Sequence, residues 1–301
     1  MTLLTPIAEK PPLSISFELF PPKTRAGMEK LVDRVSPLQA ICPDYVSVTY
    51  GAGGSSRGRT LEAIKALTAV PGFNIAGHLT CAGADRDVTL AVANRFADLG
   101  VTEIIALRGD PPKTEAPAEN PIEDTVTLVQ ELARCGRFKI RVGCYPEVHP
   151  RAASAQSDID MLKAKLDAGA DCAITQFFFD IDHWDRFFER CARAGIEDRI
   201  IPGIMPVQSF DGIARFADSC GTSVPIWMRD AYRNVGSKAE HDLLSLAICT
   251  ELCDELISRG VSGLHFYTLN QPELSIKACE ALRINRRPVI RALPAQSEIA
   301  V

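Results

Sequence analysis

The sequence predicts an α/β fold built on one closed parallel sheet, and three observations carry that prediction. Eight short apolar runs recur along the 301 residues, mostly about 30 residues apart, with amphipathic stretches between them. Their near-continuous apolar character indicates strands buried on both faces, as in a parallel sheet. No Gly-x-Gly-x-x-Gly follows an expected strand, which argues against a doubly wound dinucleotide fold. We therefore expect a single-domain (β/α)8 TIM barrel.

The expected strands are short runs of six to eight residues that end in polar side chains or turn residues. They cover residues 15–20, 45–50, 74–81, 103–108, 140–145, 172–177, 200–205 and 264–269. The segment between the seventh and eighth expected strands is the longest, so we expect extra helical structure there. We expect an N-terminal extension over 1–13, the barrel over 14–292 and a C-terminal tail over 293–301.

Helices are expected where apolar residues recur at a period near 3.6. They cover 23–40, 60–69, 85–99, 154–168, 182–194, a stretch beginning near residue 209, and 238–259, whereas 224–236 is expected to be irregular. Gly100, Gly169 and Gly195 stand just past three of these stretches, the position at which glycine commonly ends a helix.

Composition and charge exclude several classes of partner. The net charge is −5 at pH 7 and no basic stripe is present, so nucleic acid is not expected as the main partner. The N-terminus lacks the basic segment and apolar core of a secretory signal, and no apolar stretch reaches the ~18 residues needed to span a bilayer. We expect a cytoplasmic protein with no membrane partner. The sequence leaves open whether it forms a homo-oligomer.

Ten cysteines are scattered through apolar segments, and none forms a Cys-x-x-Cys pair. Cys249 and Cys253 stand one helical turn apart, but no second pair or neighbouring histidine completes a metal site. We expect these cysteines to be small buried hydrophobes in a reducing compartment, and no metal.

Glu18 is the most informative residue, because it interrupts the apolar run 15–20. A buried carboxylate is costly unless it has a partner or a chemical task. The other strand ends are also polar, and a barrel brings strand ends together at one mouth. They supply Thr49, Tyr50, His78, Thr80, Arg108, Asp110, Tyr145, Glu147, His149, Thr175, Gln176, Gln208, Phe210, Tyr267 and Asn270. Without a phosphate-binding loop or a nucleophile with a paired base, this set suits a planar polar heterocycle.

Eight motifs stand at these strand ends, in order. They read SFELFPPK (16–23), VSVTYGA (46–52), HLTC (78–81), ALRGDPP (106–112), YPEVHP (145–150), TQFFFD (175–180), PGIMP (202–206) and HFYTLN (265–270). Together they resemble the methylenetetrahydrofolate reductase family from about residue 14 to 285. The resemblance implies a TIM barrel with non-covalent FAD, which carries a hydride from NADH or NADPH to 5,10-methylenetetrahydrofolate. The product, 5-methyltetrahydrofolate, feeds methionine synthesis, and bacterial relatives favour NADH.

The resemblance also implies roles for two carboxylates. Glu18 matches the catalytic acid that protonates the leaving amine as the folate's methylene bridge opens, a task that requires burial to raise its pKa. Asp110 matches a second catalytic residue, whose negative charge stabilises the cationic iminium.

Other residues match cofactor and substrate contacts of the family. The implied cofactor-binding set is Thr49, Tyr50, Ala52, His78, Arg108, Gly109, Asp110, Tyr145, His149, Ala152, Asp158 and Lys165. The implied substrate-binding set is Glu18, Thr49, Asp110, Gln176, Phe210 and Gln271. Asp158 and Lys165 are seven residues apart, so a helix would place them on one face.

Two departures from the family pattern affect the ligands. Gln271 stands where many members carry an arginine, so a charge contact to the folate glutamate is lost or moved. Met161 replaces a commonly polar residue on the helix expected beside FAD. Two other functions remain open: a flavin-independent folate one-carbon transferase on the same barrel, and a non-catalytic flavin- or folate-binding protein. Neither the choice between NADH and NADPH nor the preferred number of folate glutamates follows from the sequence.

Overall fold

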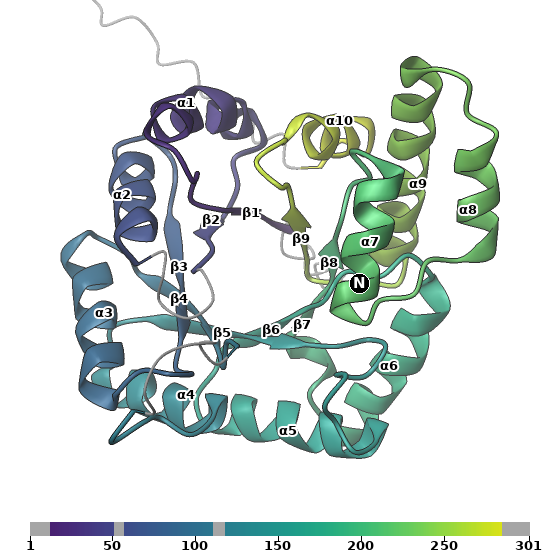
Figure 1. The fold of residues 1–301 in the computed structure, drawn as a ribbon. Helices are drawn as coiled ribbons and strands as arrows, with labels where there is room; N and C mark the ends of the chain where they lie inside the picture. The colour runs from purple at the N-terminus through teal and green to yellow at the C-terminus, as the bar shows by residue number, and fades with distance from the viewer. Residues whose placement is uncertain (1–12, 51–56, 111–117, 285–301) are drawn as a thin grey trace, which may run out of the picture.

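A computed structural model describes residues 13–50, 57–110 and 118–284. Within these residues the strands form one parallel sheet in the order β7-β6-β5-β4-β3-β2-β1-β9-β8. The strands are β1 (Ser14–Leu19), β2 (Tyr45–Val48), β3 (Ile75–Thr80), β4 (Glu103–Leu107), β5 (Lys139–Cys144), β6 (Cys172–Thr175), β7 (Ile200–Ile201), β8 (Gly203–Ile204) and β9 (Gly263–Tyr267). Figure 1 shows helices surrounding this sheet.

The barrel closes through one interrupted strand. β7 pairs with β6 and β8 pairs with β9, and only Pro202 separates the two halves. Proline has no N–H to donate to a sheet, which breaks the regular pairing there. The Pro202 carbonyl still accepts a hydrogen bond from the His265 N–H at 3.0 Å. Both ends of the sheet therefore meet in the expected seventh strand, and the predicted (β/α)8 barrel is confirmed.

Helices follow most strands, and their bounds correct several expectations. They are α1 (Arg25–Val35), α2 (Arg57–Thr68), α3 (Arg86–Asp98), α4 (Thr125–Cys135), α5 (Ala155–Asp167), α6 (Ile181–Ala194), α7 (Phe210–Cys220), α8 (Ile226–Arg233), α9 (Lys238–Ser258) and α10 (Glu273–Ala281), with 3-10 turns η1 (Ser36–Ile41) and η3 (Glu197–Arg199). The expected helix 23–40 is wrong as one element, since Pro37 at the start of η1 breaks it. The segment 224–236, expected to be irregular, contains α8.

Two helices, α4 and α10, were not expected from the sequence. The ends of α4 carry recognisable signals, because the Asp124 side chain accepts from the Thr127 N–H and Gly136 ends the helix at φ +61°. α10 begins at Pro272 without a side-chain cap, so its start has no such polar signal. Both helices are short, so tertiary packing stabilises them more than propensity does: α4 packs on β4, β5 and α5, and α10 packs on α9 and η1.

The barrel interior differs from the layer between sheet and helices. Side chains on alternate strand positions point inward, so Glu18 lies beside its register partners Ser47 and Tyr267. Deeper in the barrel an ion pair joins Arg141 to Glu103 at 2.6 Å, with side chains 14% and 8% exposed. The interior therefore already contains polar groups below the level of Glu18.

The described residues contain no helix long and apolar enough to cross a membrane. All ten cysteines are free thiols. The expectation of buried cysteines holds for six of them, whereas Cys172 and Cys220 are partly exposed. It is wrong for Cys42 and Cys135, which are exposed at the ends of η1 and α4, where the chain turns at the surface.

Candidate active site

A cavity of about 310 Å³ lies where the strands end, and Glu18 lines it. Its other polar residues come from different strands or from the loops that follow them. The lining comprises Glu18, Thr49, Tyr50, His78, Ile105, Leu107, Val142, Gly143, Cys144, Tyr145, Ile174, Gln176, Phe177, Met205, Phe216, His265, Tyr267 and Leu269. Mostly apolar walls with a few convergent polar groups are typical of a binding site for an organic ligand. We refer to it as the central cavity.

Glu18 faces His78 across the central cavity. Its Oε2 lies 3.3 Å from His78 Nε2, and its side chain is 21% exposed. Burial raises the pKa of Glu18, although the nearby imidazole opposes the shift. Burial lowers the pKa of His78, which the Glu18 carboxyl opposes. Both shifts favour a protonated carboxyl beside an uncharged imidazole, the state required of a general acid.

His265 is a second histidine near Glu18, and its sequence position alone did not assign it to the site. Its Nδ1 lies 2.8 Å from Ser16 Oγ, and its Nε2 lies 3.9 Å from Glu18 Oε2. Burial lowers the pKa of His265 to about 3, with the Arg141 charge adding to the shift, so the imidazole is neutral. A polar residue inside the apolar run 264–269 was the available signal, of the same kind that pointed to Glu18.

A second cavity of about 320 Å³ adjoins the first and shares Leu107, Gly143 and Tyr145 with it. Its lining brings together half of the residues predicted to bind the cofactor. These are Arg108, Gly109, Asp110, Tyr145, His149 and Lys165, joined by Arg151. We call it the basic cavity, because three of its side chains carry positive charge.

Asp110 lies in the basic cavity and not with Glu18. Its side chain is 73% exposed, and its Oδ1 accepts a hydrogen bond from Arg151 at 3.0 Å. The predicted pairing of two carboxylates over one ligand therefore does not appear in the cavity linings. Its catalytic role stays a prediction.

From α5, Lys165 contacts the end of β5 and Asp158 contacts the loop that follows it. Lys165 Nζ donates to the Gly143 carbonyl at 2.6 Å, and Asp158 accepts from the His149 N–H at 2.9 Å. The Ala152 N–H donates to the His149 carbonyl at 2.8 Å. Burial lowers the pKa of Lys165, and Asp158 is among the groups that oppose this shift. Asp158 and Ala152 thus fix the loop, whereas Lys165 and His149 line the basic cavity.

Phe210 and Gln271 are not brought to the central cavity. The Phe210 ring stacks on Tyr232, with centroids 4.6 Å apart, and Gln271 lines neither the central cavity nor the basic cavity. Phe216 lines the cavity instead and stacks on Phe177 at 5.6 Å. At about 100° per residue, six positions turn the side chain roughly 240° around α7, so the two rings occupy different faces. The substrate-contact prediction for Phe210 therefore fits Phe216 better, while Ala52 lies outside the described residues.

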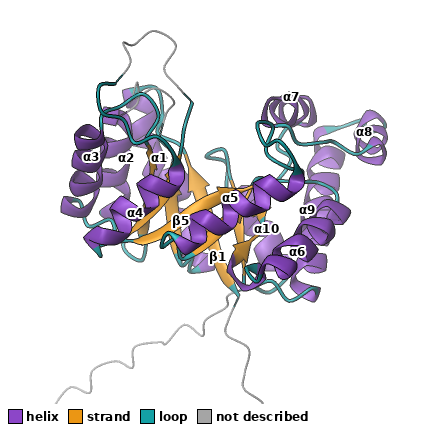
Figure 2. Ribbon diagram, turned by 90° about the horizontal axis from the view of Figure 1, so that it is seen from below, coloured by secondary structure: helices purple, strands orange, loops and turns teal. Residues whose placement is uncertain are grey.

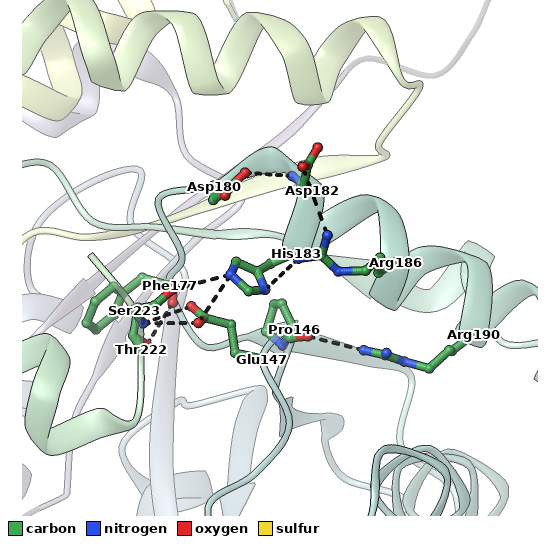
Figure 3. Close-up of polar contacts among 10 residues, drawn as sticks. All are labelled: Pro146, Glu147, Phe177, Asp180, Asp182, His183, Arg186, Arg190, Thr222 and Ser223. Carbon is green, nitrogen blue, oxygen red and sulfur yellow. Dashed lines mark hydrogen bonds and ion pairs between the residues drawn. The ribbon is translucent and has the colours of Figure 1, made fainter. Parts of the chain in front are cut away.

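Polar contacts around His183 join residues of three separate segments (Figure 3). His183 Nε2 lies 3.2 Å from Ser223 Oγ and 3.4 Å from Glu147 Oε2, while Arg186 contacts Nδ1 at 3.1 Å. Glu147 also accepts from the Ser223 N–H at 3.0 Å. Because Ser223 and Glu147 both contact the same imidazole nitrogen, this is not a nucleophile–base–acid relay. These contacts connect the loop after β5 to α6 and to the segment before α8.

A closed parallel barrel whose strand ends surround a buried carboxyl defines a TIM-barrel enzyme, with its active site at the carboxyl ends of the strands. No group of three or more His, Cys, Asp or Glu side chains in the described part of the chain is arranged to hold a metal ion.

Comparison with known proteins identifies the family. The methylenetetrahydrofolate reductase family profile matches residues 3–283. The 5,10-methylenetetrahydrofolate reductase of Escherichia coli (strain K12) is 41% identical over 273 residues, covering 90% of this chain and 91% of that protein. Methylenetetrahydrofolate reductase (NADH) 1 of Arabidopsis thaliana is 33% identical over 304 residues, covering 96% of this chain and 51% of that protein. The chain belongs to the methylenetetrahydrofolate reductase family and is an oxidoreductase.

Solved structures of other proteins share the fold at low sequence identity. Dihydropteroate synthase from Thermus thermophilus superposes with a TM-score of 0.51 at 14% identity, covering 90% of this chain and 94% of that chain. This likeness concerns the barrel architecture alone.

Proposed function

We propose that this protein reduces 5,10-methylenetetrahydrofolate to 5-methyltetrahydrofolate with FAD as its bound cofactor and NADH as its electron donor. The product would serve methionine synthesis. The main support for this reaction is the environment of Glu18. Its carboxyl lines the central cavity, and burial raises its pKa. Protonation of an amine leaving group at neutral pH needs such an acid.

The two adjoining cavities fit the two ends of FAD. His78 lines the central cavity with its Nε2 buried and 3.3 Å from Glu18 Oε2, so its imidazole ring forms part of the wall that a flat heterocycle would contact. Arg108, Arg151 and Lys165 surround the basic cavity, which suits a pyrophosphate. Tyr145 lines both cavities and its ring packs edge-on against His149 at 4.5 Å, which offers an aromatic surface between them.

In the proposed reaction, the residues of the central cavity have separate roles. FAD, when bound, supplies a two-electron carrier between nicotinamide and folate. Glu18 holds a proton on its carboxyl and donates it to the leaving amine nitrogen of the methylene bridge. Gln176 and Phe216 line the same cavity and position the pterin, and the apolar walls exclude water.

An absorbance spectrum tests the proposed function directly. Purified protein should show a flavin spectrum that bleaches under anaerobic NADH and recovers when 5,10-methylenetetrahydrofolate is added. A colourless protein that binds no added FAD, yet transfers a one-carbon group, would instead support the flavin-independent transferase.

The folate step should depend on pH through Glu18. Its raised pKa means that the reactive, protonated form persists to higher pH than for an ordinary glutamate and is lost as the pH rises through that pKa. Above it, the rate of flavin reoxidation by the folate should fall about tenfold per pH unit. Stopped-flow measurements should show no matching fall in flavin reduction by NADH. Equal pH profiles for both steps would contradict this role of Glu18.

A further inference from the structure

Residues 268–270, which follow β9, are hydrogen-bonded to the strand that carries Glu18. Figure 2 shows that strand, β1, within the sheet at the centre of the surrounding helices. Thr268 and Asn270 are 1% and 6% exposed, and neither lines the central or the basic cavity. The mechanism above gives neither side chain a role. A buried polar side chain requires hydrogen-bond partners, and here the partners lie on β1 and at its end.

Asn270 continues the pairing between β9 and β1 past the end of both strands. The last pair in their register joins Glu18 to Tyr267. Asn270 Oδ1 then accepts from the Phe20 N–H at 3.0 Å, and its Nδ2 donates to the Phe20 carbonyl at 2.8 Å. Two prolines follow Phe20, and proline has no N–H with which to extend a strand. The amide of Asn270 therefore takes the place of the backbone pairing that ends there.

Thr268 binds the backbone carbonyl of Glu18 itself. Its Oγ1 donates to that carbonyl at 2.7 Å, and its N–H donates to the same oxygen at 3.3 Å. Oγ1 also accepts from the Asn270 N–H at 3.1 Å, so the hydroxyl acts both as a donor and as an acceptor. Thr268 and Asn270 together fix the backbone on both sides of Leu19.

Between Thr268 and Asn270, the backbone adopts a conformation that is rare for leucine. φ is +50° at Leu269 and +57° at Asn270. Asparagine tolerates this left-handed region, whereas leucine seldom adopts it. A residue in such a conformation persists only where its neighbours fix it. The hydrogen bonds of Thr268 and Asn270 do so, and Leu269 lines the central cavity together with Glu18.

We propose that Thr268 and Asn270 are positioning residues for the acid. They hold the backbone at Glu18 and Phe20, so that the Glu18 carboxyl keeps its place beside His78 in the central cavity. This inference rests on the proposed function and adds to it two residues that line neither cavity. They act on the folate step alone, because flavin reduction by NADH takes no proton from Glu18.

Substitutions that remove one hydroxyl or one amide test the proposal. Thr268→Val keeps the shape of the side chain without its hydroxyl and should slow flavin reoxidation by 5,10-methylenetetrahydrofolate about five- to tenfold. Thr268→Ser keeps the hydroxyl and should retain most of the wild-type rate. Asn270→Gly removes the amide but adopts the left-handed backbone without strain, so it should slow the same step by a similar factor. Flavin reduction by NADH should stay close to wild type in all three variants.

The pH profile of the folate step distinguishes positioning from a loss of stability. Burial raises the pKa of Glu18, and a carboxyl that leaves its place becomes more hydrated, which lowers its pKa. The fall in the folate step should therefore begin at a lower pH in the two slowed variants than in wild type. The titratable groups that line the cavity with Glu18 are unchanged in these variants: Tyr50, His78, Cys144, Tyr145, His265 and Tyr267.

Thr68→Val on α2 is the matched control, because the Thr68 hydroxyl also donates to a backbone carbonyl, that of Lys65 at 3.0 Å, at the exposed end of the helix. It should change neither half-reaction nor the pH profile. An unchanged folate step in Thr268→Val and Asn270→Gly, or equal slowing of both half-reactions with the wild-type pH profile, would overturn the proposal. Asn270→Gly decides alone if Thr268→Val does not fold. A wild-type flavin that NADH does not reduce and the folate does not reoxidise would instead reject the proposed function.

Discussion

Glu18→Gln should reduce 5,10-methylenetetrahydrofolate turnover by about 10²–10⁴-fold, the usual contribution of a general acid. The amide keeps the shape of the side chain and its place beside His78, but it cannot donate the proton that opens the methylene bridge. Flavin reduction by NADH needs no such proton from this residue and should stay within a few-fold of wild type. Separate stopped-flow measurements of the two half-reactions give both rates.

The contrast between the half-reactions makes this prediction specific. A matched change at an exposed carboxyl, Glu29→Gln on α1, should affect neither step, because that side chain is 66% exposed and pairs with the exposed Arg25. If Glu18→Gln slowed both half-reactions equally, or left the folate step unchanged, Glu18 would be a structural residue of the barrel mouth.

Gly203→Ala should be the most destabilising single methyl addition near the site. A Cβ at this position would overlap the Thr175 carbonyl oxygen and lie 2.5 Å from the Tyr267 ring. The neighbours cannot yield, because the Gly203 N–H donates to Thr175 Oγ1 at 2.9 Å and the Tyr267 hydroxyl donates to the Thr175 carbonyl at 2.7 Å. We expect a loss of about 3 kcal/mol. Calorimetry should show a Tm lower by roughly 5 °C.

Gly58→Ala is the matched control for that substitution. A Cβ at Gly58, in the first turn of α2, meets no atom within 4 Å. Alanine also favours helix over glycine, so this variant should equal or exceed the wild-type stability by up to about 1 kcal/mol. Equal Tm values for Gly203→Ala and Gly58→Ala would contradict this prediction, because they would show that Thr175 and Tyr267 move aside without loss of stability.

The sequence predicted the parts of the site that lie on strands. Glu18 and His78 were identifiable because a polar residue in an apolar strand is energetically unusual, and barrel topology then determines that strand ends meet. The same logic would have identified His265. Of the predicted strand-end residues, the structure brings seven to the central cavity: Glu18, Thr49, Tyr50, His78, Tyr145, Gln176 and Tyr267.

The helices over the barrel mouth were less predictable. Phe210 and Phe216 both belong to α7, and nothing in their spacing tells which ring faces the central cavity. The structure assigns that position to Phe216, because the burial of Ile213 and Ala217 fixes how α7 is rotated on its neighbours. In the same way, the 3-10 turn η1 and the helix α8 depend on local helix breakers and on packing, and the spacing of apolar residues in the sequence indicates neither.

The amino-acid sequence by itself determined the barrel, its single domain and the acid at its mouth, because alternating apolar runs and strand-end polarity are local signals. Only the tertiary structure decided that Asp110 pairs with Arg151 in the basic cavity, away from Glu18, and that Asn270 binds the backbone of Phe20 at the end of β1. These arrangements join residues far apart in the chain, and their distances depend on how loops and helices pack on the strands. Periodicity along the chain contains no information about such distances.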